Sequence, residues 1–156
     1  MFNHEPEHYA CPFCSLIAGL ESEHNRLQDI VLQNEHVTAS IAPKWWVNNP
    51  GHVLVVPNQH YENLYDIPDD TLAEVYKAVK QVATAMRSTY EGCEGVSTRQ
   101  HNEPAGNQDV WHLHVHVFPR YPNDELYLNH DKSAFVGAEA RRPYAEKLRE
   151  FLAAGA

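Results

Sequence analysis

The sequence predicts an α+β fold, with an antiparallel meander sheet of about five strands and two helices covering it. Three observations lead to this class. Short apolar runs follow one another with only turns or loops between them, and strands joined in this way pair antiparallel. A single long segment repeats its apolar residues at helical spacing, and a later segment alternates histidine with apolar residues.

The first half of the chain supplies three of the expected strands. Residues 1–9 are polar and are expected to form a flexible N-terminal arm, followed by a short helical turn within residues 11–20. Apolar runs then predict strands at residues 27–33, 37–42 and 52–57. Asn34 and Glu35 join the first two runs as a tight turn, whereas residues 43–51 form a longer loop that carries Trp45 and Trp46.

The second half begins with the long helix. Pro68 suits a first helical turn, the carboxylates of Asp69 and Asp70 complement the positive end of the helix dipole, and Gly92 is a fitting stop. We expect a strand at residues 95–100, a polar loop at 101–109, the histidine strand at 110–119 and a last helix starting at Pro143. The element order is β-β-β-α-β-β-α, with no βαβ crossover.

Length and composition restrict the possible classes of protein. With 156 residues, of which 43% are hydrophobic and 21% charged, we expect one domain over residues 10–156 with a substantial core. A net charge of −9 disfavours a nucleic acid polymer or an anionic membrane as partner, and no apolar run reaches the about 20 residues of a membrane span. Three cysteines without an export signal favour a cytoplasmic location.

The segment His112-Leu-His114-Val-His116-Val-Phe carries the clearest chemical signal. A strand turns alternate side chains to the same face, about 6.6 Å apart, so the three imidazoles are expected on one face and the apolar residues on the other. Alternating histidines on one face can ligate a metal. Alternatively, one of them is a nucleophile that its neighbours tune. A chance pattern on a surface strand is a third and weaker explanation.

Two cysteines near the N-terminus support a metal. Cys11 and Cys14 have the C-x-x-C spacing, which is typical of half a zinc site or of a redox pair. The redox pair belongs in a βαβ context that is missing here. A pair of buried structural thiols is the remaining alternative, and spacing alone does not select further ligands among the 11 histidines.

Anion-binding candidates surround the histidine strand. The loop before it contains small and amide residues whose backbone N–H groups could turn toward an anion. Arg120 and Lys44 are the nearest candidate cations, although each is more often a solvated surface charge. His52 opens the third predicted strand, and His60 lies just beyond its end.

Several motifs together resemble the histidine triad (HIT) family. They are the triad itself, Cys-Pro-Phe-Cys at residues 11–14, Pro-Gly-His-Val-Leu-Val-Val-Pro-Asn-Gln-His at 50–60, the long helix, and Ala-Gly-Asn-Gln at 105–108. The chain looks like the zinc-containing Hint-like and bacterial HIT hydrolase branch. This resemblance implies the HIT-like fold, a homodimer, and a nucleotide or nucleotide conjugate as substrate.

The resemblance also assigns roles to individual residues. His114 would be the nucleophile that attacks the α-phosphorus, His116 would contact the phosphate oxygens, and His52 would lie behind them. In zinc-bearing relatives a structural Zn²⁺ is held by the C-x-x-C pair, a later histidine and the first triad histidine. The corresponding residues are Cys11, Cys14, His60 and His112.

Two positions depart from the family pattern. Lys44 lies at or near the position where Hint-like members carry a ribose-binding Asp, and Asp109 stands where many members have Ser or Thr near the phosphate. A carboxylate beside a phosphate is repulsive unless it points away or is protonated. The substrate-binding candidates are Asn102, Gly106, Gln108, Asp109 and Lys44.

The leading functional prediction is a nucleotide hydrolase or nucleotidyl transferase that cleaves a P–N or P–O–P bond through a nucleotidyl-histidine intermediate. Asp109 motivates the alternative of a nucleotide-binding or adaptor protein that has lost efficient catalysis. A purely metal-binding domain, in which all three triad histidines are ligands, is the third reading.

Overall fold

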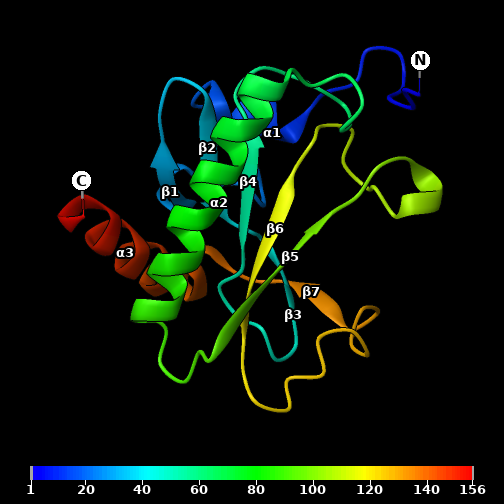
Figure 1. The fold of residues 1–156 in the computed structure, drawn as a ribbon. Helices are drawn as coiled ribbons and strands as arrows, with labels where there is room; N and C mark the ends of the chain where they lie inside the picture. Colours follow the sequence, from blue (N-terminus) through cyan, green and yellow to red (C-terminus); the bar gives the residue numbers. More distant parts are fainter. Residues whose placement is uncertain (1, 156) are drawn as a thin grey trace.

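The computed structural model describes residues 2–155 and contains a five-stranded antiparallel sheet (Figure 1). Its spatial order is β1-β2-β4-β6-β5. The strands are β1 (Ile30–Gln33), β2 (Val37–Ile41), β4 (Val53–Pro57), β6 (Val115–Arg120) and β5 (Gly95–Gln100). The predicted α+β class and the antiparallel sheet of five strands are therefore confirmed.

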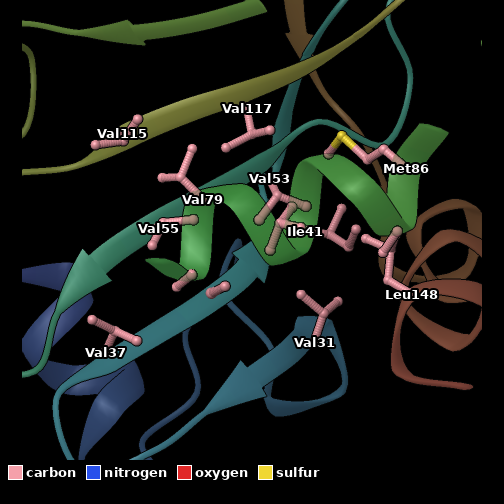
Figure 2. Close-up of a cluster of buried hydrophobic side chains, with 14 of the residues drawn as sticks. Val31, Val37, Ile41, Val53, Val55, Val79, Met86, Val115, Val117 and Leu148 are labelled. Carbon is pink, nitrogen blue, oxygen red and sulfur yellow. The ribbon is translucent and has the colours of Figure 1, made fainter. Parts of the chain in front are cut away.

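Two long helices cover one face of this sheet. Helix α2 (Asp69–Thr89) crosses the sheet, and α3 (Ala138–Ala154) lies beside α2 near the β1 edge (Figure 1). Figure 2 shows the resulting core, in which valines of β4 and β6 meet Val79 and Met86 of α2 and Leu148 of α3. Each fully buried side chain of this kind contributes about 1.5–3 kcal/mol.

The opposite face of the sheet carries the short helix α1 (Pro12–Ile17). A second, smaller cluster forms there from Cys11, Phe13, Ala42, Leu54 and Val56. Because neighbouring residues of a strand alternate between faces, β4 places Val53 and Val55 against α2 and Leu54 and Val56 against this cluster. The face of the sheet opposite α2 is where the candidate site lies.

The strand order departs from a simple meander after β4. Both β4 and β5 pair antiparallel with β6, so β4 and β5 are parallel to each other and α2 connects them across β6. The prediction of no crossover was wrong, because a helix linking non-adjacent strands has no local sequence signature. The consequence is that β6, which carries His116, lies between two other strands.

A two-stranded sheet was not predicted. Strand β3 (Lys44–Trp46) pairs antiparallel with β7 (Ser133–Phe135), and we call this pair the β3–β7 ribbon. It forms inside the segment that we had assigned to a loop. Strands of three residues show no usable alternation, and their pairing joins segments far apart in the sequence, so no local pattern indicates them.

Three element boundaries also differ. The histidine segment is strand only from Val115, because Leu113 N donates to Tyr61 O at 2.6 Å and His112 N to Val110 O at 2.8 Å instead of to a sheet ladder. Helix α3 starts at Ala138 rather than Pro143, which lies inside it. The segment Leu27–Asp29 is a 3-10 turn before β1.

Arg141 explains the early start of α3. Its guanidinium is 2% exposed and pairs with the equally buried Asp29 at 2.8 Å. It also donates to His24 O at 2.9 Å and to Val136 O. These contacts fix the first turns of α3 against the 3-10 turn, and they form only in the folded chain.

Residues 2–9 have no helix or strand but contact the rest of the chain. The backbone N–H of His4 and that of Glu5 donate to the Glu62 carboxylate, the latter at 3.1 Å, and the His4 ring lies 3.1 Å from Glu103. Within residues 2–155 none of the helices combines the length and the apolar character needed to cross a membrane.

Candidate active site and metal centre

A cavity of about 540 Å³ lies on the sheet face opposite α2. His52, His114 and His116 line it from the sheet, and Asn107, Gln108 and Asp109 line it from the loop before His112. The β3–β7 ribbon closes it with Lys44, Trp46, Ser133 and Phe135. The structure thus brings most of the predicted site residues to one cavity.

His114 is held in one orientation with one ring nitrogen left free. Its Nδ1 donates to the carbonyl oxygen of His112 at 2.7 Å, so Nε2 carries the lone pair. Phe13 packs against the ring, with centroids 5.3 Å apart, and the side chain is 2% exposed. Burial lowers the pKa of His114, which favours the neutral, nucleophilic imidazole.

His116 and His52 form a stack beside it with Phe118. The rings of His116 and Phe118 are almost parallel, 5.5 Å apart, and His52 lies 4.6 Å from Phe118. The His116 Nδ1 and His52 Nε2 atoms are 3.5 Å apart. Burial and the neighbouring His114 lower the pKa of His52 to about 3 and that of His116 well below its usual value. Both rings are therefore neutral, and a bound phosphate would meet them as hydrogen-bond donors rather than as cations.

Two further residues belong to this region and were not predicted. The pairing of β5 with β6 places Arg99 opposite His116, with its guanidinium 5.4 Å from the Phe118 ring. His101 lies edge-on to His116 at 5.8 Å and donates from Nδ1 to Gly106 O at 2.7 Å. Only the strand pairing reveals them, since neither stands at a distinctive spacing in the sequence.

Within the loop, Asn102 and Gly106 lie outside the residues that line the cavity. The Asn102 carboxamide oxygen accepts from Leu64 N at 2.8 Å, and its amide nitrogen donates to Gln100 at 3.0 Å. Gly106 accepts the His101 bond through its carbonyl. Their polar groups thus hold the loop to its neighbours.

Gln108 lines the cavity but its side chain is also occupied. Its amide donates to Glu62 O at 2.6 Å and to Val110 O at 3.1 Å, and its oxygen accepts from Glu103 N at 2.8 Å. Asp109, by contrast, is 77% exposed, and its Oδ1 lies 3.7 Å from His114 Nε2. Among residues 2–155 it is the one carboxylate that lines the cavity.

The four predicted metal ligands converge next to this cavity. The donor atoms of Cys11, Cys14, His60 and His112 lie within 4.8 Å of one another. His112 Nδ1 is 3.3 Å from Cys11 Sγ and 3.6 Å from Cys14 Sγ, and His60 Nδ1 is 3.4 Å from Cys14 Sγ. Sulfur and nitrogen ligands on a zinc tetrahedron are roughly 3.5 Å apart, given their bond lengths. The cluster fits a tetrahedral metal ion.

The far side of each histidine ring supports the same conclusion. His112 Nε2 donates to Pro57 O at 2.9 Å, and His60 Nε2 lies 2.9 Å from Glu5 Oε2. Metal-bound histidines commonly make such bonds, which turn the other nitrogen toward the ion. Burial and the adjacent Cys11 raise the pKa of Cys14 to about 12, so the thiol pair needs a cation to become thiolates.

Comparison with known proteins places this arrangement in a family. The HIT domain model matches residues 24–123. The chain belongs to the HIT domain family. This confirms the resemblance drawn from the triad and from the Gly-His block.

Relatives of the chain fall into two informative groups. A HIT-like protein of Methanocaldococcus jannaschii is 35% identical over 116 residues, which are 73% of this chain and 81% of that protein. An adenosine 5′-monophosphoramidase of Candida albicans is 31% identical over 117 residues, 72% of each chain. The Zn-bound histidine triad family protein of Mycobacterium smegmatis is 26% identical, with a TM-score of 0.75 over 93% of this chain and 94% of the other.

Proposed function

We propose that this protein hydrolyses or transfers a nucleotidyl group by cleaving a P–N or P–O–P bond at the α-phosphate of a nucleotide. One observation carries the proposal. His114 is buried at the cavity with Nδ1 bonded to His112 O at 2.7 Å, which leaves the Nε2 lone pair for attack on phosphorus. The adenosine 5′-monophosphoramidases among the relatives support this class of substrate.

In this proposal each neighbouring residue has a defined part. His114 forms the nucleotidyl-histidine intermediate, and water then releases the nucleotide. His116 donates to the phosphate oxygens, and His52 fixes the His116 ring from behind, with 3.5 Å between their nitrogens. Gln108 and Asp109 border the phosphate, and Lys44 on the β3–β7 ribbon supplies the cationic side chain of the cavity. Asn102 and Gly106 act by holding the loop that presents these groups.

We further propose that the metal is a structural zinc ion. Cys11, Cys14, His60 and His112 would fill all four tetrahedral positions, so the ion would tie the N-terminal segment to the triad without an open coordination site. Its charge would hold His112 in the neutral, ligating form. Metal analysis tests this: one zinc per chain should persist in His114→Ala and be lost in Cys14→Ala. Loss of zinc in His114→Ala would instead favour a site that uses the whole triad.

The activity test compares wild type with His114→Ala on adenosine 5′-phosphoramidate, dinucleoside polyphosphates and a nucleotide sugar. We expect wild type to cleave at least one of them and His114→Ala to bind the nucleotide without cleaving it. The adaptor alternative is favoured by one observation, the Asp109 carboxylate 3.7 Å from the nitrogen that a phosphate must approach. Nucleotide binding without turnover by wild type would establish that alternative.

The assembly and location follow from the family and the composition. We propose a cytoplasmic homodimer, since the outer edge of β5 has no partner strand in the described chain and Cys11, Cys14 and Cys93 form no disulfide. Analytical ultracentrifugation tests the dimer, and a single species of monomer mass would contradict it.

A further inference from the structure

We propose that Asp109 is the proton-transfer residue of the reaction, protonating the leaving group and then accepting a proton from the attacking water. This inference rests on the proposed function and assigns a catalytic role to the residue that departs from the family pattern. It begins from the position of the carboxylate, whose Oδ1 lies 3.7 Å from His114 Nε2.

The carboxylate is not needed to orient His114. The carbonyl of His112 already accepts the Nδ1 proton, and Phe13 packs against the ring. Asp109 lies instead on the lone-pair side, 77% exposed, where solvent reaches the cavity. A group in this place borders the phosphorus that Nε2 attacks and the path by which a leaving group departs.

Other groups at the cavity are poorly suited to donate a proton there. His116 and His52 are held neutral by burial, which lowers the pKa of each far below its usual value. The Gln108 side chain is committed to three backbone groups. Lys44 lies over Phe135 on the β3–β7 ribbon, at 5.9 Å from the ring centre. Within residues 2–155, Asp109 is the remaining acid that lines the cavity beside Nε2.

The steps balance without any added reactant. When a phosphoramidate binds, the carboxylate and an anionic phosphoryl oxygen share a proton, because the proton relieves their repulsion. His114 Nε2 attacks phosphorus, the P–N bond breaks, and its electron pair takes the proton from Asp109, so the amine leaves neutral. Water then attacks phosphorus and gives its proton to the Asp109 carboxylate, and the P–Nε2 electron pair returns to His114. General acid–base help of this kind contributes about 10²- to 10⁴-fold.

The test separates the two chemical steps by the choice of leaving group. An adenosine 5′-phosphoramidate of an alkylamine needs a proton to leave, whereas the p-nitrophenyl ester of AMP releases a stable anion that needs none. With Asp109→Asn we expect amine release to fall by about 10²- to 10⁴-fold. The nitrophenolate burst should be undiminished, while the steady state after the burst slows, because hydrolysis of the intermediate still needs the base.

Controls make the result decisive. Asp66 is an exposed carboxylate outside the cavity, so Asp66→Asn should behave as wild type with both substrates. Equal loss of both bursts in Asp109→Asn, no loss in either, or faster turnover in Asp109→Ser would overturn the inference, since the carboxylate would then only shape or repel. If wild type gives neither burst nor turnover, the proposed function fails as well. Normal turnover that Asp109→Asn leaves unchanged would refute the role of Asp109 alone.

Discussion

Gly51 occupies a position where even one added methyl group should be costly. Its φ of +77° lies in the left-handed region, and a Cβ atom there would be 2.3 Å from Cδ1 of Tyr144. Tyr144 cannot swing aside freely, because its ring packs edge-on against Trp45 and Tyr90 at 5.2 and 5.1 Å. Gly51 also precedes His52, so the strain should reach the candidate site.

The cost of Gly51→Ala has two parts. The left-handed backbone costs an alanine about 1–2 kcal/mol, and overpacking against Tyr144 costs about 1–3 kcal/mol. We therefore expect the free energy of unfolding to fall by roughly 2–5 kcal/mol, measured by urea denaturation with an unchanged m-value.

A double-mutant cycle distinguishes the two parts. Adding Tyr144→Ala removes the atoms that the new Cβ meets, so the double variant should be more stable than the sum of the singles predicts, by about 1–3 kcal/mol. The backbone part should remain. A loss below about 1 kcal/mol in Gly51→Ala, or strict additivity in the cycle, would refute this reasoning.

Three further predictions concern the charged and metal-binding groups. Arg141→Ala should reduce the free energy of unfolding by about 3–5 kcal/mol, because it leaves the Asp29 carboxylate buried without its partner; thermal and urea denaturation would show this, and a loss under 1 kcal/mol would contradict it. Since burial lowers the pKa of His52 from 6.5 to about 3, the unfolded chain binds more protons in that range, so stability should fall as pH drops from about 6.5 toward 3. In His52→Gln this pH slope should be smaller by up to about 1.4 kcal/mol per pH unit; equal slopes would show that His52 does not titrate on unfolding. Glu5→Gln should weaken zinc binding about 10-fold or more through the 2.9 Å contact with His60, as measured by competition with a chelator, with unchanged affinity as the refuting result.

Local sequence patterns predicted the elements whose signal is local. The alternation at residues 112–118 placed Leu113, Val115 and Val117 in the core, where all three are fully buried. The C-x-x-C spacing identified Cys11 and Cys14 as half a metal cluster, and the family resemblance supplied its other half. These features depend on neighbours within a few residues or on motifs that a single chain displays.

Features that depend on long-range pairing could not be predicted. The β3–β7 ribbon and the start of α3 both depend on contacts between segments about 90 or more residues apart, such as the pair of Arg141 with Asp29. Arg99 and His101 enter the site only because β5 pairs with β6. His112 and His114 leave the expected strand because the chain bonds to Tyr61 and not to β4 at that point.

The central claim is that His114 carries a covalent nucleotidyl group during turnover. Rapid quenching with acid-free denaturant during turnover of adenosine 5′-phosphoramidate, followed by intact-mass measurement, tests it directly. We predict a mass increase of one adenylyl group in wild type and in His36→Ala, whose exposed side chain lies outside the cavity, and none in His114→Ala. An adduct that persists in His114→Ala, or turnover without any adduct in wild type, would contradict the assignment of His114 as nucleophile.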